Sequence, residues 1–291
     1  MKAALIGDGI AGSLTPAMHE AEGRALGLEY RYDRMDTTQA PWNAMSLSEM
    51  IDRAEAEGLA GLNITHPFKA QAVEYVSDLS ETARTLGAIN TIVFCDGARV
   101  GHNTDYIGFR SSLRSDFAGL RLGQVLQLGA GGAGKAVALA LLDQGVASLS
   151  IYDTDLARAE DMVARLRQVR PTARLTALPA LTAEMLAGFD GAVNATPLGM
   201  AAHPGMAIDP RDLARTAWVA DIVYFPLDTA LLTRARMCGR RAVTGAGMAA
   251  YQAVAGFALI TGYTPDADRM RSFLDAALRD KARQPAVAKG V

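Results

Sequence analysis

Short apolar runs alternate with amphipathic stretches along almost the whole chain. In the first hundred residues, runs of strand character cover residues 2–7, 30–35 and 60–65. Two further runs, 89–94 and 98–103, flank Asp96-Gly97, and this dipeptide between strand-like segments predicts a β-hairpin. Helices are expected between the strands, at 16–26, 47–57, 68–76 and 80–86. Thr15 is expected to cap the first of them, with Pro16 at its first helical position, and Gly27 and Gly58 end the first two.

The second half repeats the strand-then-helix order more regularly. Strands are expected at 124–128, 147–152, 173–177, 191–194, 218–223 and 241–243, and helices at 132–142, 156–169, 182–186 and 229–238. Such a βαβ series predicts a parallel sheet with right-handed crossovers. The last helical region, 249–279, has no strand after it, so we expect it to return and pack on the first half. Residues 282–291 contain Pro285 and small side chains and are expected to fray.

Composition fits an ordinary globular α/β protein of two domains. The chain has 291 residues, of which 50% are hydrophobic and 21% charged. The formal net charge of −2 speaks against a nucleic-acid-binding protein and against attachment to an anionic membrane. No apolar run approaches the ~18 residues of a membrane span, and no signal-peptide pattern opens the chain, so we expect a cytoplasmic protein.

Metal and disulfide chemistry find no support in the sequence. Cys95 and Cys238 lack C-x-x-C spacing, which argues against a disulfide framework and against a Cys-rich zinc site. No pair of histidines or carboxylates shows metal-ligand spacing on one helix face.

A glycine-rich segment, Gly129-Ala130-Gly131-Gly132-Ala133-Gly134, follows an apolar strand and opens a helix. Gly129, Gly131 and Gly134 form the pattern G-x-G-x-x-G, which in this context predicts dinucleotide binding. Gly129 permits a tight turn, Gly131 lets the backbone approach a pyrophosphate, and Gly134 lets the helix pack close to the strand. The helix N-terminus then offers free N–H groups to the phosphates.

An acidic residue at the end of the next strand completes this pattern. Asp153 follows Gly129 at about the usual spacing of ~20 positions. A carboxylate there accepts hydrogen bonds from both ribose hydroxyls and repels a 2′-phosphate. No Arg or Lys occurs between Asp153 and Arg158, whereas a phosphate favours arginine. The segment therefore favours NAD over NADP, and the alternative interpretation of Asp153 is a strand-end cap.

A second loop, Asn194-Ala195-Thr196-Pro197-Leu198-Gly199-Met200, follows a later strand of the same series. Loops at the carboxyl ends of parallel strands line the ligand crevice of such sheets. Asn194 and Thr196 are therefore candidates for a cofactor wall. An ordinary turn formed by Pro197 and Gly199 fits the sequence equally well.

Lys69 stands out among only five lysines. It follows Pro67, where a strand is expected to become a helix, so we expect Lys69 in the first helical turn. A cation there opposes the helix dipole, and a desolvated lysine can act as a general base; a solvated lysine is the alternative. Asp105 follows the hairpin and suits an N-cap. His66 and His102 are acid–base candidates, although a lone histidine is more often structural.

Several short motifs, taken in order, resemble the shikimate dehydrogenase family, most closely its branch of NAD-dependent quinate/shikimate dehydrogenases. The motifs are Ser13-Leu14-Thr15-Pro16, residues 63–69, Gly87-Ala88-Ile89-Asn90-Thr91, Asn103-Thr104-Asp105, the glycine-rich segment, Asn194-Ala195-Thr196-Pro197, and Gly247-Met248 with Gln252. The resemblance runs from Ile6 to about Leu278. It implies a substrate domain of residues 1–105 and 248–291, and a doubly wound Rossmann-like NAD-binding domain of residues 106–247.

The resemblance also implies roles for single side chains. Lys69 and Asp105 match the family's catalytic pair. Ser13 and Thr15 match hydroxyls that hold the substrate carboxylate, with Tyr224 near the same group. Thr65, Asn90 and Gln252 match residues that bind the ring hydroxyls. Cofactor contacts are implied for Gly129, Ala130, Gly131, Gly132, Ala133, Gly134, Asp153, Asn194, Thr196, Gly247 and Met248.

Two departures from the biosynthetic branch bear on specificity. Typical members of that branch have Asn-Arg-Thr where this chain has Asp153-Thr154-Asp155. Their arginine holds the 2′-phosphate of NADP, and its absence here favours NAD. That branch also has Ser in place of Thr15, and Thr at this position resembles the branch that accepts two substrates. A methyl-sized change is worth only ~1–3 kcal/mol of discrimination, so strict specificity does not follow.

The reaction that the resemblance implies is reversible oxidation of shikimate to 3-dehydroshikimate and of quinate to 3-dehydroquinate. Hydride passes to the nicotinamide C4, and Lys69 and Asp105 handle the proton as a coupled pair, without a metal. A dehydrogenase for shikimate alone or for an amino-substituted analogue is the nearest alternative. A non-catalytic NAD-binding regulatory module is a more distant one, since it needs no proton-transfer pair. A monomer and a homodimer both fit, and hinge closure over a small-molecule substrate is expected.

Overall fold

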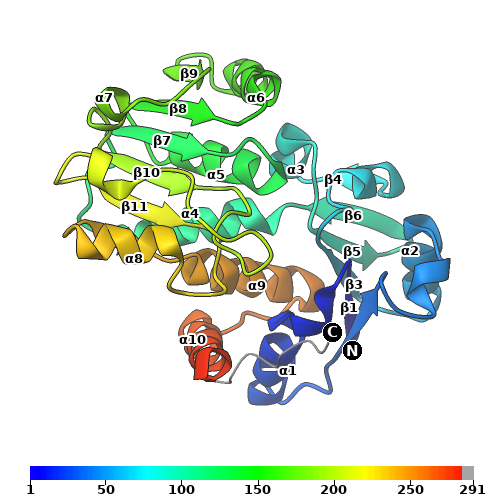
Figure 1. The fold of residues 1–291 in the computed structure, drawn as a ribbon. Coiled ribbons are helices and arrows are strands. Elements are labelled where there is room, and N and C mark those ends of the chain that lie inside the picture. The colour runs from blue at the N-terminus through cyan, green and yellow to red at the C-terminus, as the bar shows by residue number, and fades with distance from the viewer. Residues whose placement is uncertain (284–291) are drawn as a thin grey trace.

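The computed structural model describes residues 1–283, which form two α/β halves (Figure 1). The strands of the first half are β1 (Lys2–Gly7), β2 (Arg31–Asp36), β3 (Gly61–Ile64), β4 (Asp78–Leu79), β5 (Thr91–Cys95) and β6 (Ala98–His102). They form one sheet in the order β2-β1-β3-β5-β6-β4. β1 is parallel to β2 and β3, whereas β5 is antiparallel to β3 and β6. The predicted hairpin is therefore confirmed, with Asp96 and Gly97 at positive φ in its turn.

The helices of the first half are α1 (Thr15–Ala25), α2 (Leu47–Ala56) and α3 (Glu81–Leu86), with 3₁₀ turns η1 (Ile10–Gly12), η2 (Trp42–Ala44) and η3 (Gln71–Tyr75). The expected helix cap at Thr15 is wrong. The N-cap of α1 is Leu14, and Thr15 is already helical. Thr15 instead donates its backbone N–H to the Ser13 hydroxyl at 3.4 Å, so the hydroxyl before it serves the helix start.

The helix expected at 68–76 is also wrong, because only the short turn η3 forms there. Lys69 lies before this turn, and its carbonyl accepts a hydrogen bond from the Ile89 N–H at 2.9 Å. A neighbouring segment has thus taken the acceptor that a helix would need. Lys69 therefore precedes the 3₁₀ turn and begins no regular helix, so the argument from an opposed helix dipole does not apply to it. The two-residue strand β4 that follows is too short to leave a periodic signal.

The second half holds a sheet in which every pairing is parallel. Its strands are β7 (Gln124–Leu128), β8 (Ser148–Tyr152), β9 (Leu175–Leu178), β10 (Gly191–Asn194), β11 (Trp218–Asp221) and β12 (Arg241–Val243). Its helices are α5 (Gly132–Asp143), α6 (Leu156–Val169), α7 (Ala183–Leu186) and α8 (Ala230–Met237), with the 3₁₀ turn η4 (Pro210–Asp212). The strand order β12-β11-β10-β7-β8-β9 is that of a doubly wound dinucleotide-binding sheet, which confirms the predicted fold class.

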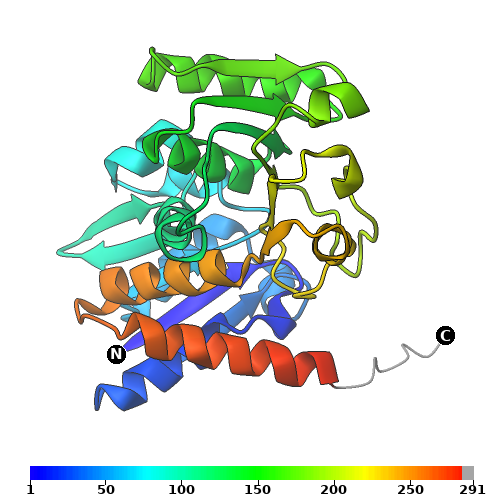
Figure 2. The same ribbon diagram turned by 90° about the vertical axis from the view of Figure 1, so that its left-hand side faces the viewer.

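Two long helices, α4 (Thr104–Asp116) and α9 (Ala246–Thr261), join the halves, and a third, α10 (Ala267–Arg283), follows α9. α4 and α9 pack closely, because a Cβ at Gly108 would lie 2.6 Å from the Met248 carbonyl oxygen. α10 runs beside α1 and α9, as Figure 2 shows, and its Leu274 shares a buried cluster with Leu5 of β1. The expected return of the last helices to the first half is confirmed. α10 continues to Arg283, and the rest of the tail expected to fray lies outside the described residues.

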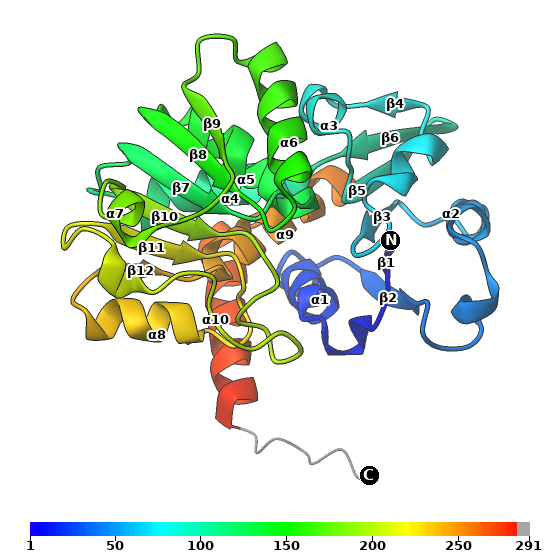
Figure 3. The same ribbon diagram turned by 45° about the horizontal axis from the view of Figure 1, so that its top comes forward.

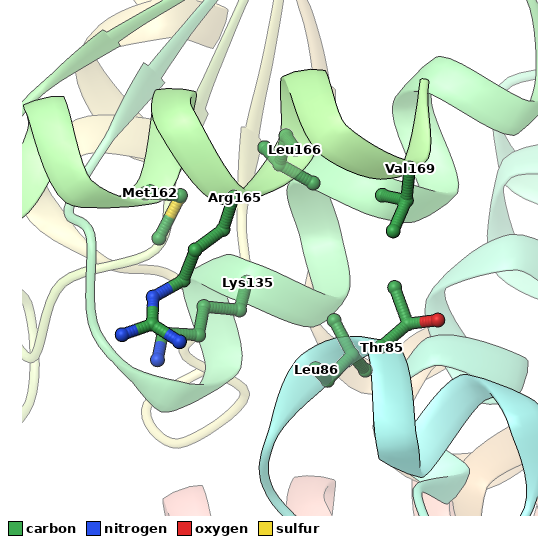
Figure 4. Close-up of a pocket in the computed structure, with 7 residues that line it drawn as sticks. All are labelled: Thr85, Leu86, Lys135, Met162, Arg165, Leu166 and Val169. Carbon is green, nitrogen blue, oxygen red and sulfur yellow. The ribbon is translucent and has the colours of Figure 1, made fainter. Parts of the chain in front are cut away.

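A second contact between the halves involves α3 on one side and α5 and α6 on the other (Figure 4). The cavity there is lined by Thr85, Leu86, Lys135, Met162, Arg165, Leu166 and Val169. Its volume of about 10 Å³ is room for a single water molecule, so this is a packed contact rather than a ligand site. Within residues 1–283, no helix combines the length and apolarity needed to cross a bilayer.

Candidate active site

Lys69, Asp105 and Asn90 meet where the first sheet adjoins α4. Lys69 Nζ donates to Asp105 Oδ2 at 2.5 Å, and Asn90 Nδ2 donates to Asp105 Oδ1 at 3.0 Å. Both carboxylate oxygens are therefore held by donors from other segments. The side chain of Asp105 is 9% exposed and that of Lys69 23%. The carboxylate is thus enclosed, while part of the lysine side chain stays accessible to a ligand.

Asn90 is the centre of a wider network. Its Oδ1 accepts from the Thr104 N–H at 2.7 Å and from the Thr104 hydroxyl at 3.1 Å. Its Nδ2 also donates to Gln252 Oε1 of α9 at 3.3 Å. These bonds occupy the amide on both sides and fix its orientation. Gln252, from the far end of the sequence, thus lies beside the Lys69–Asp105 pair.

A buried chain of polar groups lies behind Asn90, and the sequence analysis missed it as a functional feature. Asn63 Nδ2, in β3, donates to the Thr91 hydroxyl at 2.9 Å, and the Tyr32 hydroxyl donates to Asn63 Oδ1 at 2.6 Å. Burial raises the pKa of Tyr32 well above its usual value, so this hydroxyl stays a donor. The one signal available in the sequence was an asparagine inside an apolar strand, where a polar group needs partners.

The first turn of α4 corrects the expectation for Asp105. The N-cap is Asn103, whose Oδ1 accepts from the Tyr106 N–H at 3.2 Å. Asp105 lies inside the first turn, where the helix dipole favours a carboxylate and where the side chain is free to bind Lys69. Its hydrogen bonds go to Lys69 and Asn90 rather than to a histidine. Burial lowers the pKa of His102, which favours a neutral imidazole there.

Ser13, Thr15 and Thr65 lie on segments that end near the carboxyl end of β1. Ser13 and Thr15 are half-buried at the start of α1. Thr65 follows β3, and a Cβ at Gly7 would lie 2.3 Å from its methyl carbon, so glycine is required for this approach. Tyr224 follows β11 in the other half and is 36% exposed. Desolvation raises the pKa of Tyr224, and the negative charge of Asp105 raises it further.

The glycine-rich segment has the geometry of a phosphate-binding turn. Gly129 has a φ of 99°, and Gly131 is the N-cap of α5. A Cβ at Gly132 would meet nothing within 4 Å, so the turn leaves open space where a pyrophosphate could approach the backbone. These residues therefore fit a dinucleotide. Gln127, which the sequence analysis passed over, donates from Nε2 to the carbonyls of Gly129 and Gly134, both at 2.9 Å.

The Asp153 carboxylate stabilises the same turn by accepting backbone hydrogen bonds. Its Oδ2 accepts from the Ala130 N–H at 2.7 Å and its Oδ1 from the Asp155 N–H at 3.1 Å. The strand-end cap that the sequence allowed is thus one role of this carboxylate, and it holds the carboxylate close to the turn. Arg158 also lies near, with Nη2 3.6 Å from where a Cβ of Gly131 would be.

Asn194 and Thr196 are occupied within their own loop. Asn194 Nδ2 donates to the Leu198 carbonyl and to Asp221 Oδ1, both at 2.9 Å, and its Oδ1 accepts from the Thr196 hydroxyl at 2.6 Å. These bonds form the ordinary turn that was the alternative interpretation of this loop. Gly247 and Met248 lie buried in the first turn of α9, against α4. In the described part of the chain, no group of three or more His, Cys, Asp or Glu side chains could hold a metal ion.

A doubly wound sheet with a phosphate-binding turn, joined to a second sheet that carries a lysine–carboxylate pair, defines a two-domain nicotinamide-dependent oxidoreductase. Residues 5–92 match the model of the shikimate dehydrogenase substrate binding domain. The chain is 45% identical over 269 residues to the shikimate dehydrogenase (NADP(+)) of Arthrobacter sp. strain FB24, with 92% of each chain covered. It is 44% identical over 270 residues to the quinate/shikimate dehydrogenase (NAD(+)) of Corynebacterium efficiens, with 92% of this chain and 95% of the relative covered.

A solved structure agrees with these relatives. Quinate dehydrogenase from Corynebacterium glutamicum in complex with NAD superposes with a TM-score of 0.90 at 40% identity, covering 95% of this chain and 99% of that chain. The chain therefore belongs to the shikimate dehydrogenase family, which confirms the resemblance seen in its motifs.

Proposed function

We propose that the protein catalyses the reversible, NAD-dependent oxidation of one secondary ring hydroxyl of shikimate and of quinate. The observation that carries the proposal is the Lys69–Asp105 pair, partly buried and supported by Asn90. Such a pair suits proton transfer to and from an alcohol oxygen. The products are 3-dehydroshikimate and 3-dehydroquinate.

Lys69 handles the proton of the reacting hydroxyl. When bound, the nicotinamide accepts or donates hydride at C4. In the oxidising direction Lys69 acts as a neutral amine, and the lone pair on Nζ accepts the hydroxyl proton. In the reducing direction the ammonium returns this proton to the alkoxide oxygen and stabilises its developing charge. Asp105 accepts one hydrogen bond from Nζ and so orients the amino group toward the substrate. Because the two groups are coupled, they titrate as a pair.

The remaining polar side chains hold the substrate. Ser13 and Thr15 donate hydroxyls to its carboxylate, with Tyr224 approaching from the other half. Thr65, Asn90 and Gln252 hydrogen-bond the ring hydroxyls. The hydrogen bonds of Asn90 to both Asp105 and Gln252 support this assignment, because they place ring binding next to proton transfer.

NAD is the proposed cofactor because Asp153 carries a negative charge beside the phosphate-binding turn. Gly129 to Gly134 cradle the pyrophosphate, Asp153 binds the ribose, and Asn194, Thr196, Gly247 and Met248 line the nicotinamide side. NADP is the second candidate, favoured by Arg158 near Gly131 and by the name of the Arthrobacter relative. We further propose the domain division at residues 105/106 and 247/248. A cytoplasmic location and a monomer or homodimer stay predictions.

Initial rates with quinate and with shikimate, each with NAD and with NADP, test the proposal on the purified protein. Turnover of both acids with a strong NAD preference is the expected result. Activity with shikimate and NADP alone would still agree with the role of Lys69 but would overturn the NAD preference argued from Asp153. Absence of turnover in all four mixtures would overturn the proposed reaction and favour an analogue substrate or an NAD-binding regulatory module.

A further inference from the structure

Two cations hold the backbone of the segment that carries Ser13 and Thr15. Lys281 Nζ donates to the Gly12 carbonyl at 2.5 Å, and Arg34 Nη2 donates to the Ser13 carbonyl at 2.9 Å. Lys281 comes from α10 and Arg34 from β2, so the two bonds reach successive residues from different elements. The segment is therefore fixed by positive charges at both carbonyls.

The electrostatic surroundings of this segment favour an anion. The first turn of α1, which begins at Thr15, contains no acidic side chain, and its dipole presents a partial positive charge. Lys281 Nζ would lie 3.6 Å from a Cβ at Gly12, so its charge sits against the main chain at the protein surface. The full charge of the ammonium and the partial charge of the helix start thus act on the same place.

Lys281 also contacts the other half of the molecule. Its Nζ lies 5.3 Å from the centre of the Phe225 ring, a cation–π distance. Phe225 follows Tyr224, the tyrosine proposed to approach the substrate carboxylate. Figure 3 shows α10 running past the junction between the two halves. The Lys281 ammonium therefore contacts the segment that carries Ser13 and Thr15 in one half and the loop that carries Tyr224 and Phe225 in the other.

We infer that Lys281 is a positioning residue that makes the enzyme select substrates with an ionised carboxylate; the inference rests on the proposed function. Lys281 fixes Gly12 so that the hydroxyls of Ser13 and Thr15 present their hydrogens to the carboxylate. Its charge lowers the free energy of the bound anion. Through its contact with Phe225, Lys281 also keeps the loop that carries Tyr224 next to the segment that carries Ser13 and Thr15.

The test compares Lys281→Met, Lys281→Arg and the control Arg279→Gln, which removes one charge from an exposed position of the same helix. Each variant is assayed with shikimate and with its methyl ester, which keeps the ring hydroxyls and loses the charge. Lys281→Met should raise KM for shikimate about 3- to 10-fold while kcat changes less than about 2-fold. In Lys281→Met, KM for the ester should change less than about 2-fold. Lys281→Arg keeps the positive charge, so its KM for shikimate should stay close to that of the wild type.

Salt provides a second readout. The difference in KM for shikimate between wild type and Lys281→Met should shrink as ionic strength rises, because added ions screen a charge at the protein surface. Thermal unfolding of each variant shows whether α10 still packs.

Three outcomes would overturn the inference: an unchanged KM for shikimate, an equal loss for the ester, or an equal loss in Arg279→Gln. An equal loss for the ester would show that Lys281 does not select for the charge of the substrate. A wild type that turns over neither acid would remove the proposed function and the inference with it. An active wild type with any of the three outcomes would remove only the inference.

Discussion

Lys69 and Asp105 are 36 positions apart in the chain and 2.5 Å apart in space. The sequence singled out each residue for a local reason that the structure overturned. Lys69 was expected in a helical turn with an opposed dipole, and Asp105 was expected to cap a helix. What brings them together is Asn103, which caps α4 and leaves Asp105 in the first turn. Recognition of family motifs, rather than local physics, was needed to pair them from the sequence.

Removal of the Lys69 amine should abolish most of the activity without loss of the cofactor site. Lys69→Ala should lower kcat about 10²- to 10⁴-fold, the usual contribution of a positioned acid–base group. The dissociation constant for NAD, measured by fluorescence or calorimetry, should stay the same. Lys2→Ala, at an exposed lysine of the same half, serves as control. A Lys69→Ala enzyme that keeps more than about a tenth of kcat would contradict the assigned role.

Cofactor preference should depend on Asp153. Asp153→Asn removes the negative charge and should raise kcat/KM with NADP relative to NAD by about tenfold or more, because repulsion of the 2′-phosphate is relieved. Asp155→Asn makes the same change of charge two residues away, where Asn still caps α6, and should leave the preference unaltered. The ratio of kcat/KM for the two cofactors measures the effect. Equal shifts in both variants would assign the preference to the general field of the loop.

At the scale of elements, the parallel strands and their helices were predicted well because each has its own periodicity. β1, β7, β10, β12 and α6 match the expected bounds, and the other parallel strands and their helices differ by a residue or two at an end. The helix expected at 68–76 does not form because the Lys69 carbonyl accepts from the Ile89 N–H, and residue 89 lies far outside any local sequence window. Packing between α4 and α9 was likewise invisible in the sequence, since Gly108 carries no pattern of its own.

Gly108→Ala should destabilise the protein, although alanine is the better helix former. The added Cβ would meet the Met248 carbonyl oxygen at 2.6 Å and the Gln252 nitrogen at 2.7 Å, so α4 and α9 must separate. We expect a loss of about 1–3 kcal/mol of unfolding free energy, measured by urea denaturation. Ser111→Ala, at a half-buried position of the same helix, is the control and should have little effect. A neutral or stabilised Gly108→Ala would mean that the helices can separate without cost.

At the scale of the whole molecule, α9 and α10 determine the architecture, because they carry the end of the chain back to the first sheet. Their cluster encloses His19, which packs against Tyr30, Tyr32 and Phe257. Burial lowers the pKa of His19 from 6.5 to about 3, with a smaller opposing effect from a backbone hydrogen bond. The folded protein therefore keeps this imidazole neutral while the unfolded chain protonates it.

Stability should consequently fall as the pH drops from 6.5 toward 3. Over this range the unfolded state binds a proton that the folded state does not, which costs up to about 1.4 kcal/mol per pH unit. Between pH 7 and pH 5, wild type should lose about 2 kcal/mol more than His19→Gln, measured by urea unfolding. His203→Gln, at an exposed histidine, should behave as wild type does. Equal acid losses in wild type and His19→Gln would show that other groups govern the effect.

The sequence by itself determined the α/β class, the doubly wound second half, the phosphate-binding turn and the family, because strand and helix periodicity and short ordered motifs are local properties. The tertiary structure decided the rest. It brought Lys69, Asn90, Asp105 and Gln252 together, revealed Gln127 and Asn63 as supports, and set Lys281 against Gly12 and Phe225. These contacts join residues distant in the chain, and only packing of the two sheets around α4, α9 and α10 fixes which of them meet.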